Sequence, residues 1–169
     1  MSQRTRILIV VGALALVAVM FAVIGFAAQS QTAQAPASTP QPGLIHLYVN
    51  GTFTANLVPA EMTKLPPASF IDKEQGKTQS GYLLKDVILL YVKENTLSPT
   101  TQIVVSGVRQ GTENKSATLT WAETLDPTNN LLFSPSNDGQ SVKIAGTLSR
   151  LSTRDSWVQG LTQIDVKTK

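Results

Sequence analysis

The sequence predicts an α+β domain that is dominated by β-strands and preceded by one transmembrane helix. Three observations support this fold class. Residues 7–28 form a long run without charge, the chain beyond residue 43 contains many short runs of β-branched and aromatic residues, and only residues 83–92 place apolar side chains on one helical face.

The N-terminal segment has the length and composition of a membrane anchor. Arg4 and Arg6 lie within residues 1–6, and the 22 residues of 7–28 follow without a charged side chain. At a rise of about 1.5 Å per residue this helix is about 33 Å long, which is enough to cross the hydrocarbon core of a bilayer. The run is also longer than the about 7–15 apolar residues of a cleaved signal peptide. We therefore expect an uncleaved single-pass helix, with cleavage at Ala33-Gln34-Ala35 as the alternative.

The charges around this run predict its orientation. Both arginines precede it and no cation follows it closely, so the N-terminus is expected in the cytoplasm and the later residues outside the cell membrane. Residues 29–43 contain only Gln, Ala, Ser, Thr, Pro and Gly, which predicts a flexible to semi-extended stalk. Residues 44–169 are then long enough for one extracytoplasmic domain with its own core.

Short strands are expected to make up most of this domain. Residues 44–53 alternate apolar and polar side chains before Asn50-Gly51, a pair that favours the type I′ turn of a β-hairpin. Residues 59–67 are typical of a short helix or turn that ends at Leu65-Pro66-Pro67, because the residue before a proline avoids the helical region. Further strands are predicted at residues 68–72, 102–107, 116–120, 131–133, 142–145, 148–151 and 161–166. The remaining predicted elements are a loop at 73–80 that turns on Gly76, a helix at 83–92, a helical turn at 121–126 and a turn at Asn137-Asp138-Gly139.

Composition excludes several classes of function. The chain has no cysteine and a single histidine, His46, which rules out thiolate catalysis, cysteine-based zinc sites and metal sites made of several histidines. The domain beyond the anchor carries 12 Lys and Arg against 11 Asp and Glu, so it lacks the basic surface that nucleic acid requires. No glycine-rich phosphate loop, zinc motif or nucleophile elbow is present. We therefore predict no catalytic residues and no metal ligands.

Six segments of the domain occur in an order that matches a known family. They are Leu65-Pro66-Pro67 before a strand, the helix-leading Gly81-Tyr82-Leu83-Leu84-Lys85-Asp86-Val87, the strand Ile103-Val104-Val105-Ser106-Gly107, the turn Asn137-Asp138-Gly139, residues 145–151, and the closing Arg154-Asp155-Ser156-Trp157-Val158 with Ile164-Asp165-Val166. In this order, over roughly residues 44–166, the chain resembles the sulfite-oxidase-like, molybdopterin-binding oxidoreductase domain. The resemblance implies that family's fold, and it implies molybdopterin as the cofactor of an active member.

The chain departs from this family where the family's chemistry takes place. In catalytic members a cysteine after the first core strand binds molybdenum, whereas the matching residues here, 71–76, contain no cysteine. The family's "D-G-Y" turn is replaced by Val108-Arg109-Gln110-Gly111, and the proline of its "G-P-L-R-L" segment is absent from residues 146–151. The resemblance therefore implies the fold rather than the activity, and no bound cofactor is expected.

Four residues are the candidates for ligand binding: Arg109, Arg150, Arg154 and Trp157. The planar fork of arginine binds phosphate through two charge-assisted hydrogen bonds. The resemblance places Arg150 and Arg154 near the pterin-facing C-terminal segment of the family. The alternative is that the arginines are solvated loop residues and that Trp157 anchors the core.

Three further residues are given structural roles. His46 is expected to be structural or exposed, because no residue that could orient it as a catalytic base is identifiable. Asp72 and Glu74 are expected in a solvated loop, since two carboxylates fall short of a calcium site.

Together these patterns predict a membrane-anchored, extracytoplasmic binding module without redox catalysis of its own. Its expected partners are the membrane and either a small molecule or a neighbouring membrane protein, and nucleic acid is not expected. Two alternatives remain, namely a pterin-dependent oxidoreductase and a structural subunit of a membrane assembly.

Overall fold

The computed structural model describes residues 39–109, 113–136 and 141–168. The predicted residues 1–6, the predicted transmembrane helix 7–28, residues 29–38 of the stalk and the turn Asn137-Asp138-Gly139 lie outside these ranges. Among the residues that are described, no helix has the length and apolar character needed to cross a membrane.

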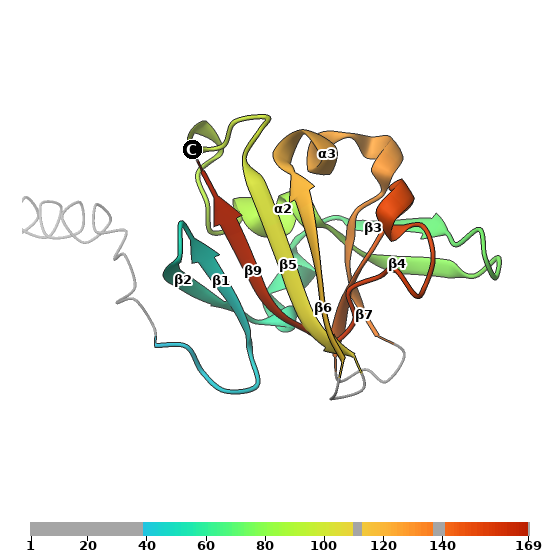
Figure 1. Ribbon diagram of the computed structural model, residues 1–169, viewed down its shortest axis with the longest axis horizontal. Coiled ribbons are helices and arrows are strands. Elements are labelled where there is room, and N and C mark those ends of the chain that lie inside the picture. The colour runs from blue at the N-terminus through green and yellow to red at the C-terminus, as the bar shows by residue number, and fades with distance from the viewer. Residues whose placement is uncertain (1–38, 110–112, 137–140, 169) are drawn as a thin grey trace, which may run out of the picture. The chain divides into compact units, whose positions relative to one another are not determined.

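β-Strands dominate the described chain, as the sequence predicted, and they form two sheets (Figure 1). The first, sheet A, has five strands in the order β2-β1-β9-β5-β6, in which β1 and β9 are parallel and the other pairs antiparallel. Its strands are β1 (Ile45–Val49), β2 (Thr52–Leu57), β5 (Gln102–Arg109), β6 (Glu113–Thr120) and β9 (Leu161–Lys167). The second, sheet B, is antiparallel in the order β3-β4-β7-β8, with β3 (Pro67–Ile71), β4 (Thr78–Leu83), β7 (Leu132–Pro135) and β8 (Val142–Ala145).

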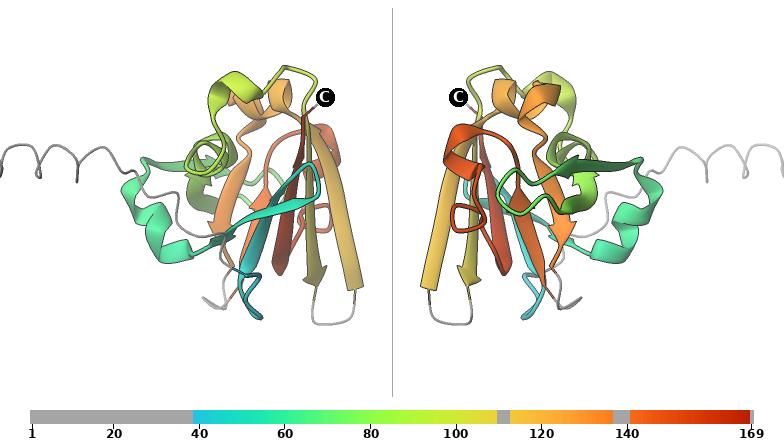
Figure 2. Two further views of the ribbon diagram at one scale, coloured as in Figure 1. Left: turned by 90° about the vertical axis from the view of Figure 1, so that its left-hand side faces the viewer. Right: turned by 90° about the vertical axis from the view of Figure 1, so that its right-hand side faces the viewer.

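Sheet A has one covered and one bare face among the described residues. Figure 2 shows sheet B and the short helices on one side of it and no described element on the other. The covered face follows the strand period of two, because Ile103, Val105 and Ile164 are fully buried while the residues between them are partly open. The alternating pattern therefore places polar side chains on the bare face.

The predicted β-hairpin of β1 and β2 is confirmed. Asn50 and Gly51 connect the two strands with φ angles of 51° and 76°, the left-handed pair that a type I′ turn requires. The chain just before β1 is tied to this hairpin, since the backbone N–H of Gln41 donates to Asn56 Oδ1 at 3.2 Å and Asn56 Nδ2 donates to the Thr39 carbonyl at 3.2 Å. The end of the predicted stalk is therefore held against the sheet.

The helices are short. The predicted helix at 83–92 is present as α2 (Leu84–Leu89), with Leu84, Val87 and Ile88 buried, and the helical turn at 121–126 as α3 (Trp121–Leu125). The helix prediction was too long because Leu83 belongs to β4 and the chain tightens after Leu89. Four 3₁₀ turns complete the fold: η1 (Pro59–Lys64), η2 (Glu94–Thr96), η3 (Pro127–Asn129) and η4 (Ser149–Leu151).

The predicted strand at 148–151 was wrong. These residues contain η4, in which the N–H of Leu151 donates to the Leu148 carbonyl at 2.7 Å. Sheet B ends at Ala145, so the segment has no strand to pair with, and of its four side chains only Leu151 is fully buried. One buried apolar residue in a short run is compatible with either a strand or a turn.

Candidate functional site

Arg154 and Trp157 lie together in the segment between η4 and β9. Arg154 Nε donates to Asp72 Oδ2 at 3.2 Å, and its guanidinium carbon lies 5.8 Å from the centre of the Trp157 ring. The backbone N–H of Arg154 donates to Glu74 Oε2 at 3.0 Å, so the loop after β3 is docked on this segment. The Asp72 side chain is fully buried and that of Arg154 is 26 % exposed. The pair therefore acts as a partly buried link between two loops.

This link corrects the prediction of a solvated loop for Asp72, which is buried, whereas Glu74 is exposed as predicted. A buried carboxylate is stable only when it is paired and hydrogen-bonded. Asp72 has both kinds of partner, because its Oδ1 accepts the N–H of Glu74 at 2.8 Å while Oδ2 faces Arg154. No sequence pattern predicts this pair, because the compensating arginine is 82 residues away in the chain.

Trp157 is a core residue, as the alternative reading of the sequence held. Its side chain is buried, its Nε1–H donates to the Leu151 carbonyl at 2.9 Å, and the Phe70 ring meets it edge-on at 6.5 Å. A second cation, Lys143 Nζ, lies 5.0 Å from the ring centre and donates to Gln79 Oε1 at 2.9 Å. Cations over a tryptophan face are stabilising. The Trp157 ring therefore lies within cation–π distance of two cations of the same chain, Lys143 and Arg154.

The other two candidate arginines also have carboxylate partners. Arg109 Nη1 lies 3.0 Å from Asp155 Oδ1. Arg150 contacts both carboxylate oxygens of Glu123, with Nη1 at 3.0 Å from Oε1, and its Nε donates to the Thr118 carbonyl at 3.0 Å. The paired Arg150 guanidinium lowers the pKa of Glu123 below its ordinary value.

The three arginines therefore do not form an open phosphate site. Each has a carboxylate of the same chain, and Arg150 lies against α3 and β6 rather than with Arg154 and Trp157. Molybdopterin carries a phosphate and a metal-binding dithiolene, and it needs cations that are free to receive it. The side chains at these positions do not fit that cofactor.

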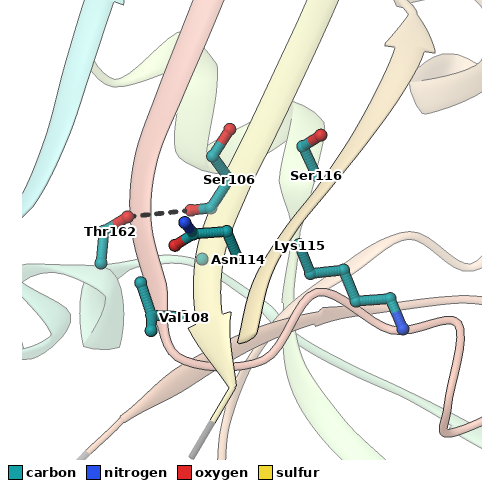
Figure 3. Close-up of a pocket in the computed structure, with 7 residues that line it drawn as sticks. Ser106, Val108, Asn114, Lys115, Ser116 and Thr162 are labelled. Atoms are coloured by element: carbon teal, nitrogen blue, oxygen red, sulfur yellow. Dashed lines mark hydrogen bonds between the residues drawn. The ribbon is translucent and has the colours of Figure 1, made fainter. Parts of the chain in front are cut away.

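A polar hollow lies on the bare face of sheet A, where β9, β5 and β6 run side by side (Figure 3). Its volume is about 260 Å³. The residues that line it come from all three strands: Ser106, Gly107, Val108, Asn114, Lys115, Ser116 and Thr162.

A β-bulge shapes this hollow. Ser106 of β5 pairs with Gln163 of β9 and the next residue, Gly107, pairs with Leu161, so Thr162 is the extra residue on β9. A bulge re-aims the side chain of the extra residue, and the Thr162 hydroxyl here donates to the Ser106 carbonyl at 3.2 Å. A Cβ on Gly107 would lie 2.4 Å from the Gln159 carbonyl oxygen, which leaves no room for a side chain. The bulge, which sets Thr162 among the lining residues, therefore contributes to the hollowed surface.

The lining has unused hydrogen-bonding groups. The side chains of Ser106, Asn114 and Ser116 make no hydrogen bond to any other described residue. In Figure 3 the Asn114 amide lies beside the hydrogen bond between Thr162 and Ser106, whereas Lys115 extends away from them. The surface can therefore offer hydroxyl and amide groups to a ligand.

None of the hollow's residues was among the predicted site residues. Ser106 and Ser116 were placed on strands, and their outward direction follows from the alternation. Their pairing across β5 and β6, and the bulge at Thr162, depend on the strand order and have no sequence signal.

The described residues hold no cluster of three or more His, Cys, Asp or Glu side chains that could bind a metal ion. His46 Nε2 lies 2.9 Å from the Gln41 carbonyl oxygen, and its ring meets those of Tyr48 and Phe53 edge-on at 6.4 and 6.1 Å. These contacts fit the structural role expected for it. Burial and a 2.9 Å hydrogen bond to Glu61 raise the pKa of Tyr91, which lies outside the hollow.

No family model and no curated protein matches this chain.

Proposed function

We propose that this protein is a membrane-anchored, extracytoplasmic binding module without redox catalysis of its own, and that the hollow on sheet A is its binding site. The observation that carries the proposal is the lining of the hollow, where several polar side chains keep free hydrogen-bonding capacity on an otherwise bare sheet face. Polar groups that converge on a concave surface are typical of a ligand site.

The anchor in this proposal rests on the sequence. The 22 uncharged residues of 7–28 have the length of a membrane span, and the preceding arginines favour a cytoplasmic N-terminus. The described domain would then be exposed to the extracytoplasmic space.

We also propose the sulfite-oxidase-like fold for residues 44–169. The order of the six motifs supports it, and so does the place of Gly81. This glycine lies on β4, where a Cβ would be 2.4 Å from the Phe133 carbonyl oxygen, and the buried Leu84 and Val87 follow it on α2. The glycine-led helix motif thus has a packing reason in this chain.

The pterin-dependent alternative draws no support from the candidate residues. A phosphate would have to displace Asp72, Glu123 or Asp155 from its arginine. For Asp72 this would leave a buried carboxylate without its counter-ion, which is strongly unfavourable.

Elemental analysis and native mass spectrometry of the full chain test the proposal. We expect protein purified from its native host to contain no stoichiometric molybdenum and to retain a small ligand. A molybdenum enzyme carried through the same purification controls for loss of metal. One molybdenum atom per chain would contradict the proposal.

A further inference from the structure

Polar side chains continue from the hollow across the bare face of sheet A. The strand registers align Ser116, Ser106, Gln163 and His46 in one row over β6, β5, β9 and β1. A neighbouring row contains Thr118, Val104, Asp165 and Tyr48. Because adjacent strands lie about 4.8 Å apart, each row is about 14 Å long. The face therefore offers an extended path rather than a single point of contact.

An aromatic cluster lies at the far end of this path. His46, Tyr48 and Phe53 meet edge-on, with ring centres 5.8–6.4 Å apart, and all three are partly exposed. The mutual contacts hold the rings in fixed positions, so they present an apolar surface with a polar edge.

Asp165 lies between the hollow and the aromatic cluster with an unsatisfied oxygen. Its Oδ1 has no hydrogen-bond partner among the described residues, while its Oδ2 lies 4.0 Å from Lys167 Nζ. An unpaired buried acceptor is unfavourable, so a donor supplied by a ligand would stabilise it. The side chain is 16 % exposed, and rotation about its broad terminal torsion can turn Oδ1 outward.

The chemistry of this face selects among ligands. An anionic ligand would need free Arg or Lys side chains. The two rows contain none, the nearby Lys167 Nζ lies 4.0 Å from Asp165 Oδ2, and the ammonium of Lys115 points away from the hollow. An apolar ligand would leave the hydroxyl and amide groups unpaired. A ligand with many hydroxyl groups and no charge matches the face, since its C–H surfaces can pack on the rings while its hydroxyls donate and accept.

We infer that the ligand is a neutral carbohydrate chain, which lies across the bare face of sheet A from the hollow to the aromatic cluster. This inference rests on the proposed function and specifies its ligand. Ser106, Asn114 and Ser116 bind the hydroxyls at one end, Asp165 accepts a hydroxyl hydrogen midway, and Tyr48 contacts a sugar ring at the other end.

Calorimetric titration of the full chain tests this inference. The protein is kept in a polyoxyethylene detergent, because detergents with sugar headgroups would compete. The probes are the neutral tetrasaccharides of β1,4-linked glucose, β1,4-linked N-acetylglucosamine, α1,4-linked glucose and β1,4-linked mannose. We expect saturable binding of at least one of them, and no binding of any would overturn the inference.

Variants then test the placement. Asn114→Ala removes an exposed amide from the hollow and is expected to weaken binding about tenfold, as the loss of one hydrogen bond predicts. Asn95→Ala, an exposed asparagine on η2, is the matched control and is expected to bind as the unaltered chain does. Equal affinities of the two variants would overturn the placement.

Tyr48→Ala tests the other end of the path, with thermal unfolding as the check on folding. A tenfold loss for the tetrasaccharide is expected, and an unchanged affinity would contradict the extended path. The proposed function would be contradicted by a different result, namely stoichiometric molybdenum in the purified chain. The failure of the carbohydrate inference can therefore be distinguished from the failure of the proposed function.

Discussion

At the scale of single residues, two aspartates that each pair with an arginine differ strongly in burial. Asp72 and Asp155 each pair with a nearby arginine, but the Asp72 side chain is fully buried and that of Asp155 is 82 % exposed. The same chemical change at the two positions should therefore have different effects on stability.

Asp72→Asn leaves Arg154 without its counter-ion. Removal of one partner from a fully buried pair costs roughly 3–5 kcal/mol, and because Arg154 is partly exposed we expect a loss of about 2 kcal/mol in the free energy of unfolding. Asp155→Asn is the matched control, with an expected loss below about 0.5 kcal/mol. Urea denaturation at pH 7 measures both, and equal losses would show that the pair between Asp72 and Arg154 is not a stabilising link.

The sequence identified some of these residues but not their roles. Arg109, Arg150 and Arg154 were candidates because arginine binds phosphate well, and because the family resemblance places Arg150 and Arg154 near a pterin-facing segment. Their carboxylate partners come from distant segments, which composition and spacing cannot reveal. The hollow was missed for the same reason, since Ser106, Asn114 and Thr162 meet only after β5, β6 and β9 are paired.

At the scale of elements, Arg150 joins three parts of the chain. Thr120 and Glu123 form a capping box at the start of α3, with the Glu123 N–H 3.2 Å from Thr120 Oγ1 and the Thr120 N–H 2.7 Å from Glu123 Oε2. Arg150, on η4, binds the same carboxylate and also the Thr118 carbonyl of β6, an edge strand of sheet A. The arginine thus occupies one hydrogen-bonding group of an exposed sheet edge.

This junction predicts a pH dependence of stability. The hydrogen bond to Arg150 lowers the pKa of Glu123 in the folded state. The stabilisation that the Glu123–Arg150 pair gives the folded state is therefore complete above the unfolded pKa of about 4.3. It is lost as the pH falls through the lower folded pKa. Arg150→Met should reduce the free energy of unfolding at pH 7 by up to about 1 kcal/mol, since Arg150 is 41 % exposed. The variant should also lose less stability than the unaltered chain when the pH falls from about 5 to about 3.

Urea midpoints at several pH values check this prediction. Arg109→Met is the control, because its partner Asp155 is exposed and the capping box is left intact. A pH profile of Arg150→Met that matches the profile of the unaltered chain would contradict the prediction.

Helices, strands and turns were predicted best where neighbouring residues in the sequence determine their conformation. The Asn50-Gly51 turn and the existence of the strand β5 depend on neighbouring residues and were predicted correctly. The η4 segment was predicted as a strand because a short run of this kind can pair only if sheet B continues past Ala145. Sheet B ends there, so the segment forms a turn instead. Helix α2 was predicted too long because Leu83 is equally suited to a strand that precedes it.

At the scale of the whole molecule, the β-dominated α+β class was correct, whereas the order of strands in the two sheets was not predictable. The anchor at residues 7–28 stays a prediction, and it determines where the proposed binding face would be presented. Two arginines near the middle of the segment, Leu14→Arg with Val17→Arg, would each add about 2.5–3.5 kcal/mol to the cost of insertion.

We expect this double variant to leave the membrane fraction in an alkaline wash of cell membranes, where the unaltered chain is retained. Leu14→Ile with Val17→Leu changes the same positions without charge and should be retained. Retention of the arginine variant at the level of the unaltered chain would contradict the anchor.

The position of β9 has a consequence for how the protein is made. This strand is the last of the described strands to leave the ribosome, yet it lies between β1 and β5. Until it arrives, the β1–β2 hairpin and the β5–β6 hairpin lack the strand that joins them in sheet A. A chain in this state cannot complete sheet A, and such non-local pairing forms slowly. If the domain is exported, it would therefore cross the membrane unfolded and close only when its final strand emerges, so protein stalled during export should be far more sensitive to protease than finished protein.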